Sequence, residues 1–506
     1  MQSFVSTVAY RGIETLDVSV QVHMSNGLPA MAIVGLADKA VAESKERVRA
    51  ALSSLGLALP AKRIAVNLSP ADLLKEGAHF DLPIAMGLLT AMGVLPSDSL
   101  SEHIILGELA LDGSIRWVVG ILPAALHARG SAKALIWPAE NGAEAAWAGD
   151  LTILASQNLT ELINHLRGNQ LLATPVACAE PPPDNGPDLA DLKGQETARH
   201  ALEIAAAGGH NLLMIGPPGA GKSMLAARLP SLLPPLTASE ALEATMIHSV
   251  AGALPASRLI QQRPFRDPHH SASMASLVGG GQKAWPGEVS LAHRGVLFLD
   301  ELAEFSHPAL DSLRQPLETG DIVIARANHH VRYPARFQLV AAMNPCRCGY
   351  LSDPARACSR APRCAQDYMA RISGPILDRF DILLDVAELR PSELLSEQLS
   401  ESTAAVRKRI LSSRNFAAAR HSDHPEILNA HLEAKSLNEE LKNNEEIRAL
   451  YSEALEKQAL SARGFHKSIR VARTIADLAA SQHITRYHVL EALSYRQFFL
   501  FGADNG

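Results

Sequence analysis

The sequence predicts an α/β protein in which a parallel-sheet core follows a mixed first unit and precedes a helical region. From about 188 to 389, apolar strand-like runs alternate with helical segments, which is the pattern of a parallel sheet covered on both faces. Residues 390–506 are rich in Ala, Leu, Glu, Lys and Arg, and we expect them to be helical. Residues 1–176 combine alternating runs such as 16–22 with helical runs such as 39–55, and the Pro-rich segment 177–187 predicts a linker.

Composition narrows the class of protein. The chain has 506 residues, with 47% hydrophobic and 20% charged residues, which is ordinary for a globular protein. The formal net charge is −6, so any nucleic-acid site must be a local basic lining. No apolar stretch reaches membrane-spanning length, and the first residues lack the basic and apolar blocks of a secretory signal. We therefore expect a cytoplasmic protein with no membrane partner.

The strongest motif follows the apolar run 211–215. It matches the phosphate-binding pattern G-x-x-x-x-G-K-[ST] and is followed by a helix-like run from residue 224. Its members are Gly216, Pro217, Pro218, Gly219, Ala220, Gly221, Lys222 and Ser223. In this context Lys222 would reach the β- and γ-phosphates of a nucleotide, and Ser223 would hold Mg²⁺. The alternative is an ordinary glycine-rich turn.

Two later strand ends complete the expected site. The apolar run 295–299 ends in Asp300 and Glu301, where Asp300 fits a Mg²⁺-ordering carboxylate and Glu301 fits the base for an attacking water. The run 337–343 ends at Asn344, which can sense the γ-phosphate and orient that water. Taken alone, such an acidic pair would be two solvent-exposed residues at the beginning of a loop. Its position after the phosphate loop favours a catalytic role.

Four of the five cysteines cluster with the spacing C-x-C-x9-C-x5-C, at Cys346, Cys348, Cys358 and Cys364. Without a secretory signal a disulfide framework is not expected. Four thiolates suit tetrahedral Zn²⁺, so we predict a zinc knuckle over 346–364. The spacing differs from standard zinc fingers, and a loop with free thiols is the alternative.

Together these motifs resemble the AAA+ ATPases and, more narrowly, the Mg-chelatase-like ComM/YifB family. The resemblance covers nearly the whole chain. Its most specific segments are 264–273, 279–281, 286–293, 343–346 and 371–381. It implies a P-loop AAA+ parallel-sheet core (188–389) with a helical lid (390–506), an ATP- and Mg²⁺-dependent hydrolase and a hexameric ring. It also implies a helicase that promotes DNA branch migration during recombination and natural transformation.

The resemblance assigns roles to further residues. Arg379 matches the arginine finger that a neighbouring subunit would supply, with Arg371 as the second choice, and a simple ion pair with Asp378 or Asp381 is the alternative. Arg463 matches the second sensor, which would contact the γ-phosphate from the lid. Gln195 matches a segment that flanks the adenine. A finger supplied by a neighbouring subunit implies a homo-oligomer.

Two insertions fall where related ring motors carry loops that line a central pore. Residues 265–285 offer one set of candidates for single-stranded, forked or branched DNA, and a predicted hairpin, 321–326 with 331–333, offers another. The candidates are Arg266, His269, His270, Lys283, Arg326, His329, His330 and Arg332. For each residue the alternative is an ordinary solvated side chain. A metal site at His269 and His270 is not favoured, because no further ligand follows at a suitable spacing.

The first unit resembles a Lon-protease-like (ribosomal S5 domain 2-like) α+β domain, through residues 74–85, 106–113 and 120–126. A Lon-type protease needs a Ser nucleophile and a Lys base. The nucleophile region here reads His79-Phe80-Asp81, and Pro123 lies near the expected Lys. We therefore expect a protease-inactive domain.

Three function classes remain after this comparison. The first is the DNA motor, which predicts ATP hydrolysis stimulated by forked or four-way DNA. The second is a chelatase-type or protein-remodelling motor that acts on a partner protein, which predicts no such stimulation. The third is an ATP-dependent protease, and the missing Ser–Lys pair argues against it.

Overall fold

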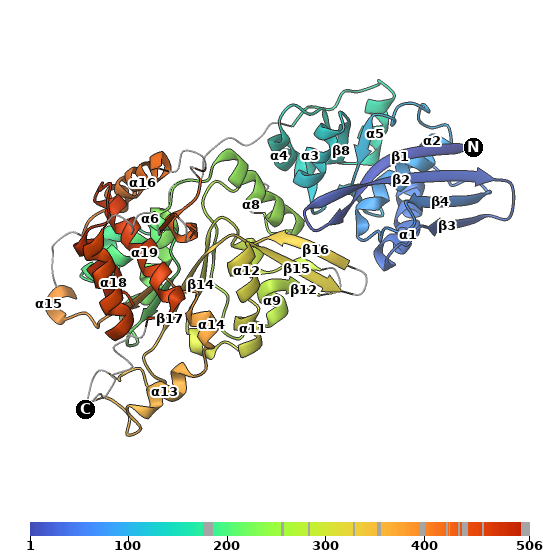
Figure 1. Cartoon of the computed structure of the whole chain (residues 1–506). Helices are drawn as coiled ribbons and strands as arrows, with labels where there is room; N and C mark the ends of the chain where they lie inside the picture. Colours follow the sequence, from blue (N-terminus) through green and yellow to red (C-terminus); the bar gives the residue numbers. More distant parts are fainter. Residues whose placement is uncertain are drawn as a thin grey trace.

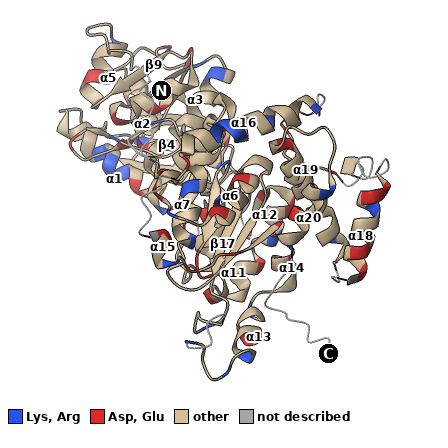
Figure 2. Ribbon diagram, turned by 90° about the vertical axis from the view of Figure 1, so that its left-hand side faces the viewer, with Lys and Arg blue, Asp and Glu red and all other residues tan. Residues whose placement is uncertain are grey.

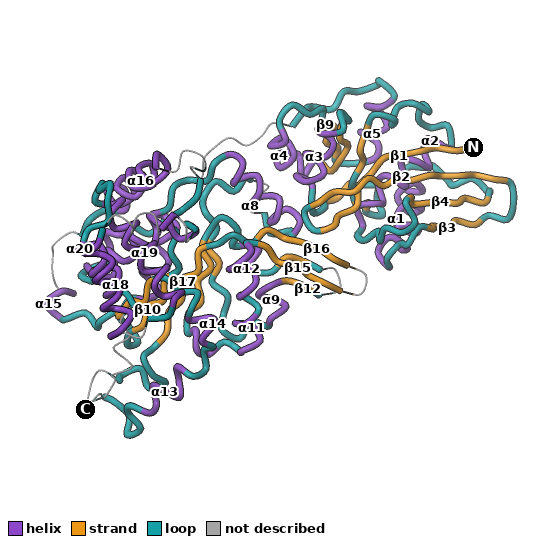
Figure 3. Tube along the Cα trace, viewed as in Figure 1, coloured by secondary structure: helices purple, strands orange, loops and turns teal. Residues whose placement is uncertain are grey.

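The computed structural model describes residues 1–175, 186–254, 258–281, 284–326, 329–351, 356–394, 400–420, 424, 426–433, 436–437, 444–457 and 460–496. An N-terminal domain occupies one end of the molecule, and a central sheet with a helical C-terminal part occupies the other (Figure 1). Figure 3 shows that most strands lie in the N-terminal and central domains, while the C-terminal part is helical. The expected order of a mixed unit, an α/β core and a helical region is confirmed.

The N-terminal domain is an α+β fold around a seven-stranded mixed sheet. The strand order is β3(Ala30–Val34), β4(Arg63–Ser69), β2(Glu14–Ser25), β1(Gln2–Arg11), β5(His103–Ile105), β8(Ala134–Pro138) and β9(Ile153–Ser156). The main helices are α1(Lys39–Ser54), α2(Asp81–Ala91), α3(Ile121–Gly130) and α5(Leu159–Leu166). In β2 the buried side chains alternate, from Val18 to Met24, because successive residues of a strand point to opposite faces. The sheet thereby packs one apolar face on α1 and α2.

The central domain contains a five-stranded sheet in which every pairing is parallel. Its order is β11(Phe265–Arg266), β14(Val296–Leu299), β17(Gln338–Met343), β10(Leu212–Ile215) and β18(Ile382–Asp385). Alternate residues of β10 enter different cores, with Leu212 and Met214 on one side and Leu213 and Ile215 on the other. Apolar groups therefore cover both faces, as expected for a parallel sheet.

Helices α6(Glu196–Gly208) and α7(Lys222–Leu232) contribute to the core on one face of this sheet. The C-terminal helices join the same core: α16(Thr403–Arg420), α18(Glu445–Lys457), α19(Ala462–Leu478) and α20(Arg486–Ser494). On α19 nearly every residue from Ser468 to Asp477 is buried, because this helix packs against α6, α16 and α20. None of the helices in the described part of the chain is both long and apolar enough to span a membrane.

Among the described residues, the N-terminal domain contacts the central domain through helix α3 and through the turn between β1 and β2. Helix α3 packs on α8(Ala238–Val250), where the N–H of Gly120 donates to the Ser249 carbonyl oxygen at 3.1 Å and the Ser249 hydroxyl donates to buried Glu144. The turn between β1 and β2 lies against β16(His329–Pro334), so close that a Cβ on Gly12 would be 2.7 Å from Cγ1 of Val331. Gly12 has φ +69°, which a glycine adopts without strain.

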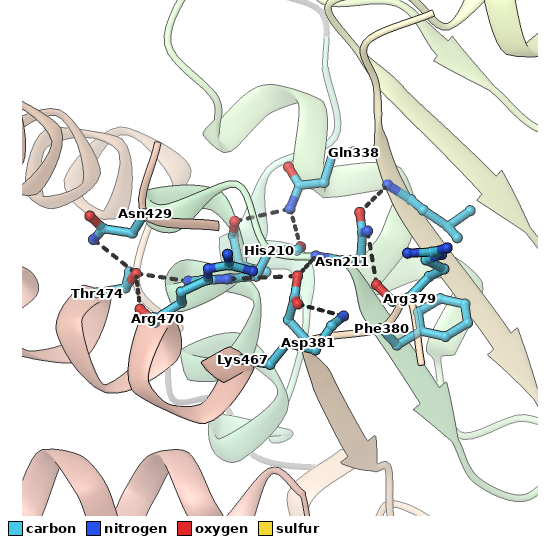
Figure 4. Close-up of polar contacts among 12 residues, drawn as sticks. His210, Asn211, Gln338, Arg379, Phe380, Asp381, Asn429, Lys467, Arg470 and Thr474 are labelled. Carbon is cyan, nitrogen blue, oxygen red and sulfur yellow. Dashed lines mark hydrogen bonds and ion pairs between the residues drawn. The ribbon is translucent and has the colours of Figure 1, made fainter. Parts of the chain in front are cut away.

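A buried polar network joins the central sheet to the C-terminal helices (Figure 4). At its centre, Asp381 accepts from the N–H of Asn211 at 2.9 Å and pairs with Nζ of Lys467 on α19 at 2.8 Å. Burial alone would raise the pKa of Asp381, but the charges of Lys467 and His210 outweigh burial and hold this pKa well below its usual value. His210 also pairs with the hydroxyl of Thr474 on α19, at 2.7 Å.

We predict that Lys467→Met destabilises the protein by about 3–5 kcal/mol, because the substitution leaves a buried carboxylate without its ion-pair partner. Chemical denaturation followed by far-UV circular dichroism measures this loss. Adding Asp381→Asn to Lys467→Met should recover part of the loss. Lys39→Met changes a lysine whose side chain is 92% exposed and should shift the free energy of unfolding by less than about 0.5 kcal/mol. A Lys467→Met protein as stable as this control would contradict the interpretation.

Candidate active site

The phosphate loop lies where the sequence predicts it, between β10 and α7. Gly219 and Gly221 have φ values of +79° and +85°, which allow the tight turn before the helix. The Nζ of Lys222 is directed back into this loop, where it donates to the carbonyl oxygens of Gly216 and Pro217 at 2.7 and 2.9 Å. Burial lowers the pKa of Lys222, although the nearby charge of Asp300 opposes that effect. The loop amides and α7 together form an anion-binding end of a helix.

The expected magnesium ligands are adjacent. Ser223 donates to Oδ2 of Asp300 at 2.7 Å, which links the start of α7 to the end of β14. A hydroxyl and a carboxylate are oxygen ligands of the kind that Mg²⁺ takes beside nucleotide phosphates. The two side chains therefore fit as the residues that would hold Mg²⁺.

Glu301 and Asn344 flank the same edge of the sheet. Because β14, β17 and β10 are neighbours and parallel, their carboxyl ends bring Glu301, Asn344 and the phosphate loop together, as the sequence predicted. Asn344 Oδ1 accepts from Nζ of Lys222 at 3.2 Å. Glu301 has the left-handed backbone conformation, with φ +52°, and its side chain is about half exposed. A non-glycine residue at this φ is uncommon and is found at functional sites.

A cleft of about 890 Å³ opens beside the start of α6 and the end of β18. Its lining includes Gln195 just before α6, Asp385 at the end of β18 and Glu388 after that strand. Nε2 of Gln195 donates to the carbonyl oxygens of Ala220 and Ala387, at 3.2 and 2.6 Å, and so joins the phosphate loop to the far wall. This position fits the expected adenine-side role of Gln195.

The two expected arginines lie at the opposite edge of the sheet. The N–H of Asp381 donates to the Asn211 carbonyl oxygen at 2.9 Å, so the turn 378–381 is beside the beginning of β10, whereas the phosphate loop follows its end. Arg379 pairs with Glu318 on α12(Arg314–Thr319), and its side chain is only 17% exposed. Arg463, at the start of α19, lies 3.8 Å from Asp378 and is 63% exposed. Neither guanidinium therefore reaches the phosphate loop of its own chain.

The insertion after α8 makes internal contacts that the sequence does not reveal. Arg266, on β11, forms a two-bond ion pair with Glu288, and His269 lies 2.8 Å from the hydroxyl of Ser271. Nδ1 of His270 lies 2.9 Å from Oε2 of Glu301, so this candidate polymer contact touches the expected catalytic base. Lys283 lies outside the described residues. No periodicity or spacing in the sequence could have shown these pairings, which join segments separated by loops.

The predicted hairpin exists, but its second strand begins earlier than expected. It consists of β15(Asp321–Arg326) and β16(His329–Pro334), so His330 belongs to a strand and pairs with Ala325. One face is buried and consists of Ile322, Ile324, Val331 and Tyr333. Arg332 and His330 are on the exposed face, where Arg332 pairs with Asp321. The side chains of Arg326 and His329 lie outside the described part of the structure.

This hairpin packs against the insertion. The hydroxyl of Tyr333 donates to the Ala284 carbonyl oxygen at 3.0 Å, and a Cβ on Gly279 would lie 2.9 Å from Cδ1 of Ile324. In Figure 1 the strands β15 and β16 lie beside β12(Gly279–Gly280). Basic and acidic residues occur in both halves of the molecule, so a basic lining would be local (Figure 2). The insertion and the hairpin are thus packed against each other.

The structure brings three of the four predicted cysteines together. The sulfur atoms of Cys346, Cys348 and Cys364 all lie within 4.8 Å of one another, and Cys346 is fully buried. Cys358 is partly buried and packs against this group, but its sulfur is not among those that all lie within this distance. Hydrogen bonds from the Cys346 thiol and from backbone N–H groups lower the pKa of Cys348 to about 6. Three converging thiols, with a fourth cysteine packed beside them, are donors of the kind that a structural Zn²⁺ site uses.

The region where a Lon-type protease would have its nucleophile has a structural role here. Asp81 is fully buried and accepts from the guanidinium of Arg47 at 2.6 and 2.9 Å. It also accepts from the N–H of Leu109 at 3.2 Å. The carboxylate is satisfied by these contacts, which tie α1, α2 and β6(Glu108–Leu109) together.

We predict that Glu301→Gln lowers the kcat for ATP hydrolysis by about 10²–10⁴-fold, because the amide cannot accept the proton of water. Nucleotide affinity should stay within about threefold of wild type, whereas Lys222→Ala should weaken it by at least about tenfold. Phosphate release and binding of a fluorescent ATP analogue measure the two quantities. Glu304→Gln, which changes a nearby acid paired with Arg371, is the control and should keep its kcat. If Glu301→Gln and this control lost kcat to the same extent, Glu301 would not be the catalytic base.

Comparisons with known proteins agree with this geometry. Residues 188–394 match the magnesium chelatase subunit ChlI family, residues 20–141 match the family of subunit ChlI of Mg-chelatase, and residues 400–496 match its C-terminal part. The chain is 44% identical to the competence protein ComM of Haemophilus influenzae, with 96% of each chain covered. It is 43% identical to the uncharacterized protein YifB of Escherichia coli, with 98% and 97% covered.

A more distant relative is the magnesium-chelatase 38 kDa subunit of Rhodobacter capsulatus. The two are 31% identical over 171 residues, which span 30% of this chain and 49% of that subunit. The family and the site together indicate an ATPase that uses ATP and Mg²⁺. The chain belongs to the Mg-chelatase-like ComM/YifB family of AAA+ proteins.

Proposed function

We propose that this protein is an ATP-dependent DNA motor, a helicase that promotes branch migration during DNA recombination and natural transformation in the cytoplasm. The observation that carries the proposal is the contact between His270 and Glu301, because it joins the loop surface to the catalytic base. The similarity to a protein named for competence supports the choice of DNA. ATP hydrolysis would thereby depend on whether the insertion and the β15–β16 hairpin are bound to DNA.

In this proposal the chain's residues prepare a water for attack on the γ-phosphate. Ser223 and Asp300 would hold Mg²⁺, which supplies charge neutralisation at the phosphates. Lys222 would exchange its bonds to loop carbonyl oxygens for bonds to phosphate oxygens. Glu301 would accept the proton of the water, and Asn344 would orient that water from the neighbouring strand end.

We propose that each site is completed by an adjacent copy of the chain. Arg379 and Arg463 lie at the sheet edge opposite the phosphate loop, so a head-to-tail contact would bring them to the next subunit's nucleotide. Such a contact closes into a ring when the rotation allows, and we propose a hexamer. Arg379 would have to exchange its bond to Glu318 for the γ-phosphate.

The surface formed by the insertion and the β15–β16 hairpin is the proposed DNA contact. Arg332 and His330 are exposed on one face of the hairpin and would meet the phosphate backbone. His270 would release Glu301 when the insertion moves on DNA. Arg266, held by Glu288, would position the insertion rather than bind phosphate.

The second candidate is a chelatase-type or protein-remodelling motor that acts on a partner protein. It is favoured by the similarity to a magnesium-chelatase subunit and by Val323, which is 48% exposed beside Arg332 on the hairpin. An exposed apolar side chain can grip a polypeptide. This motor would hydrolyse ATP without responding to DNA.

We also propose that the four-cysteine cluster binds one Zn²⁺ ion. Cys346, Cys348 and Cys364 offer three converging sulfur donors, and Cys358, which packs beside them, would be the fourth. Asn344, two residues before Cys346, belongs to the proposed hydrolytic machinery. The ion would be structural, because four thiolates leave no open position for substrate.

We predict that forked DNA raises the ATPase rate of the wild-type protein by at least about fivefold and that Arg332→Ala loses most of this increase, because Arg332 would contact phosphate. The ATPase rate of His270→Ala should no longer depend on DNA, so it should be similar with and without forked DNA. Phosphate release at several salt concentrations measures both effects. Arg11→Ala, an exposed arginine of the N-terminal domain, is the control. A wild-type rate indifferent to DNA would favour the protein-directed motor.

We predict that mixing two inactive variants restores activity. Lys222→Ala lacks a working phosphate loop but keeps Arg379, whereas Arg379→Ala lacks the finger but keeps the loop. If a site needs both chains, mixed rings contain some complete sites and should recover roughly a quarter of the wild-type rate. Phosphate release after co-incubation measures the recovery. No activity above that of the separate variants, in rings shown to exchange subunits, would contradict shared sites.

A further inference from the structure

The cysteine cluster forms a small core of its own. Its buried members are Cys346, Cys364 and Ala365, and its partly buried members are Cys348, Leu351 and Cys358. This cluster is separate from the two larger cores of the central domain. A segment with so little apolar area cannot hold its shape by burial alone, so metal–thiolate bonds would have to fix it.

The cluster is attached to the nucleotide site at its first residue. Cys346 follows Asn344 by two positions, and Asn344 accepts from Nζ of Lys222 at 3.2 Å. Gly349, in the same turn, has φ +85°, and a Cβ placed on it would be 2.6 Å from Cδ of Pro218. The cysteine turn therefore abuts Pro218 of the phosphate loop and is continuous with Asn344, which accepts from Lys222 of that loop.

A second connection leads to the opposite wall of the site. The guanidinium of Arg356 stacks on the ring of Tyr350 at 4.5 Å and also pairs with Glu388. Glu388 lines the cleft beside Ala387, whose carbonyl oxygen accepts from Gln195 at 2.6 Å. The cysteine segment thus contacts the nucleotide site on two sides.

We infer that the metal-bound cysteine cluster is a positioning element of the ATP site. Cys346, Cys348 and Cys364, with Cys358 beside them, would hold the zinc, and these bonds would fix the turn that carries Asn344 and abuts Pro218. Loss of the metal frees this turn, so that Asn344 no longer orients the water. The inference rests on the ATP site proposed above, and it is independent of DNA.

The test combines metal analysis with a double-mutant cycle. Wild-type protein should contain about one zinc per chain and Cys364→Ser less than about 0.1. Cys364 is on α13(Arg363–Met369), well separated from Asn344 in sequence. The kcat of Cys364→Ser should fall to that of Asn344→Ala, and the double variant should be within about twofold of either, because both remove one function. The inference would be overturned if the double variant lost kcat by the product of the two single losses. It would also be overturned if Cys364→Ser lost its zinc and kept its kcat.

Three further variants distinguish positioning from general damage. Cys364→His supplies another zinc ligand and should restore both zinc and kcat, and Cys178→Ser, outside the cluster, should change neither. Gly349→Ala should keep its zinc and weaken the binding of a fluorescent ATP analogue by at least about threefold, because the new Cβ displaces Pro218. This variant decides the matter if Cys364→Ser fails to fold, and unchanged affinity in it would overturn the inference. Full activity of Asn344→Ala would instead refute the role of Asn344 in the proposed function.

Discussion

The buried carboxylate of Asp381 is the constraint on which the arrangement of the central and C-terminal parts depends. Its carboxylate is bound to the beginning of β10 through Asn211 and to α19 through Lys467. The same turn carries Arg379, whose carbonyl oxygen accepts from the Asn211 side chain at 3.0 Å. One ion-paired group therefore fixes the phosphate-loop strand, the arginine turn and the helical part relative to one another. A buried charge of this kind is stable only when all its partners are present.

The parallel sheet separates the two halves of the proposed hydrolytic site. Carboxyl ends of β10, β14 and β17 carry the phosphate loop, the acidic pair and Asn344, whereas the arginines lie at the other edge. In the proposed function, a single chain would therefore supply two incomplete parts of the site, which an adjacent copy would complete. The N-terminal domain supports the central domain at the β15–β16 hairpin and at α8. The turn at Gly12 lies against the hairpin, and Glu144 accepts from Ser249 on α8. Movement of the hairpin would involve that domain as well.

The sequence predicted those features whose residue pattern lies within one short segment. The glycine turn at Gly219, the apolar strand before Asp300 and the alternating hairpin strands each follow from local rules. It missed contacts between distant segments, such as His270 with Glu301 and Arg266 with Glu288, because no periodicity encodes them. The hairpin strand also begins earlier than expected, since pairing extends to His329 despite two histidines.

The measurement that tests the central claim most directly is the processing of a four-way DNA junction assembled from labelled oligonucleotides. The protein would be incubated with the junction and ATP, and the products separated on a native gel. A DNA motor should convert the junction into two-stranded products with ATP but not with a non-hydrolysable analogue. A junction that stays intact, under conditions where the same preparation hydrolyses ATP, would contradict the account and indicate a motor that acts on protein.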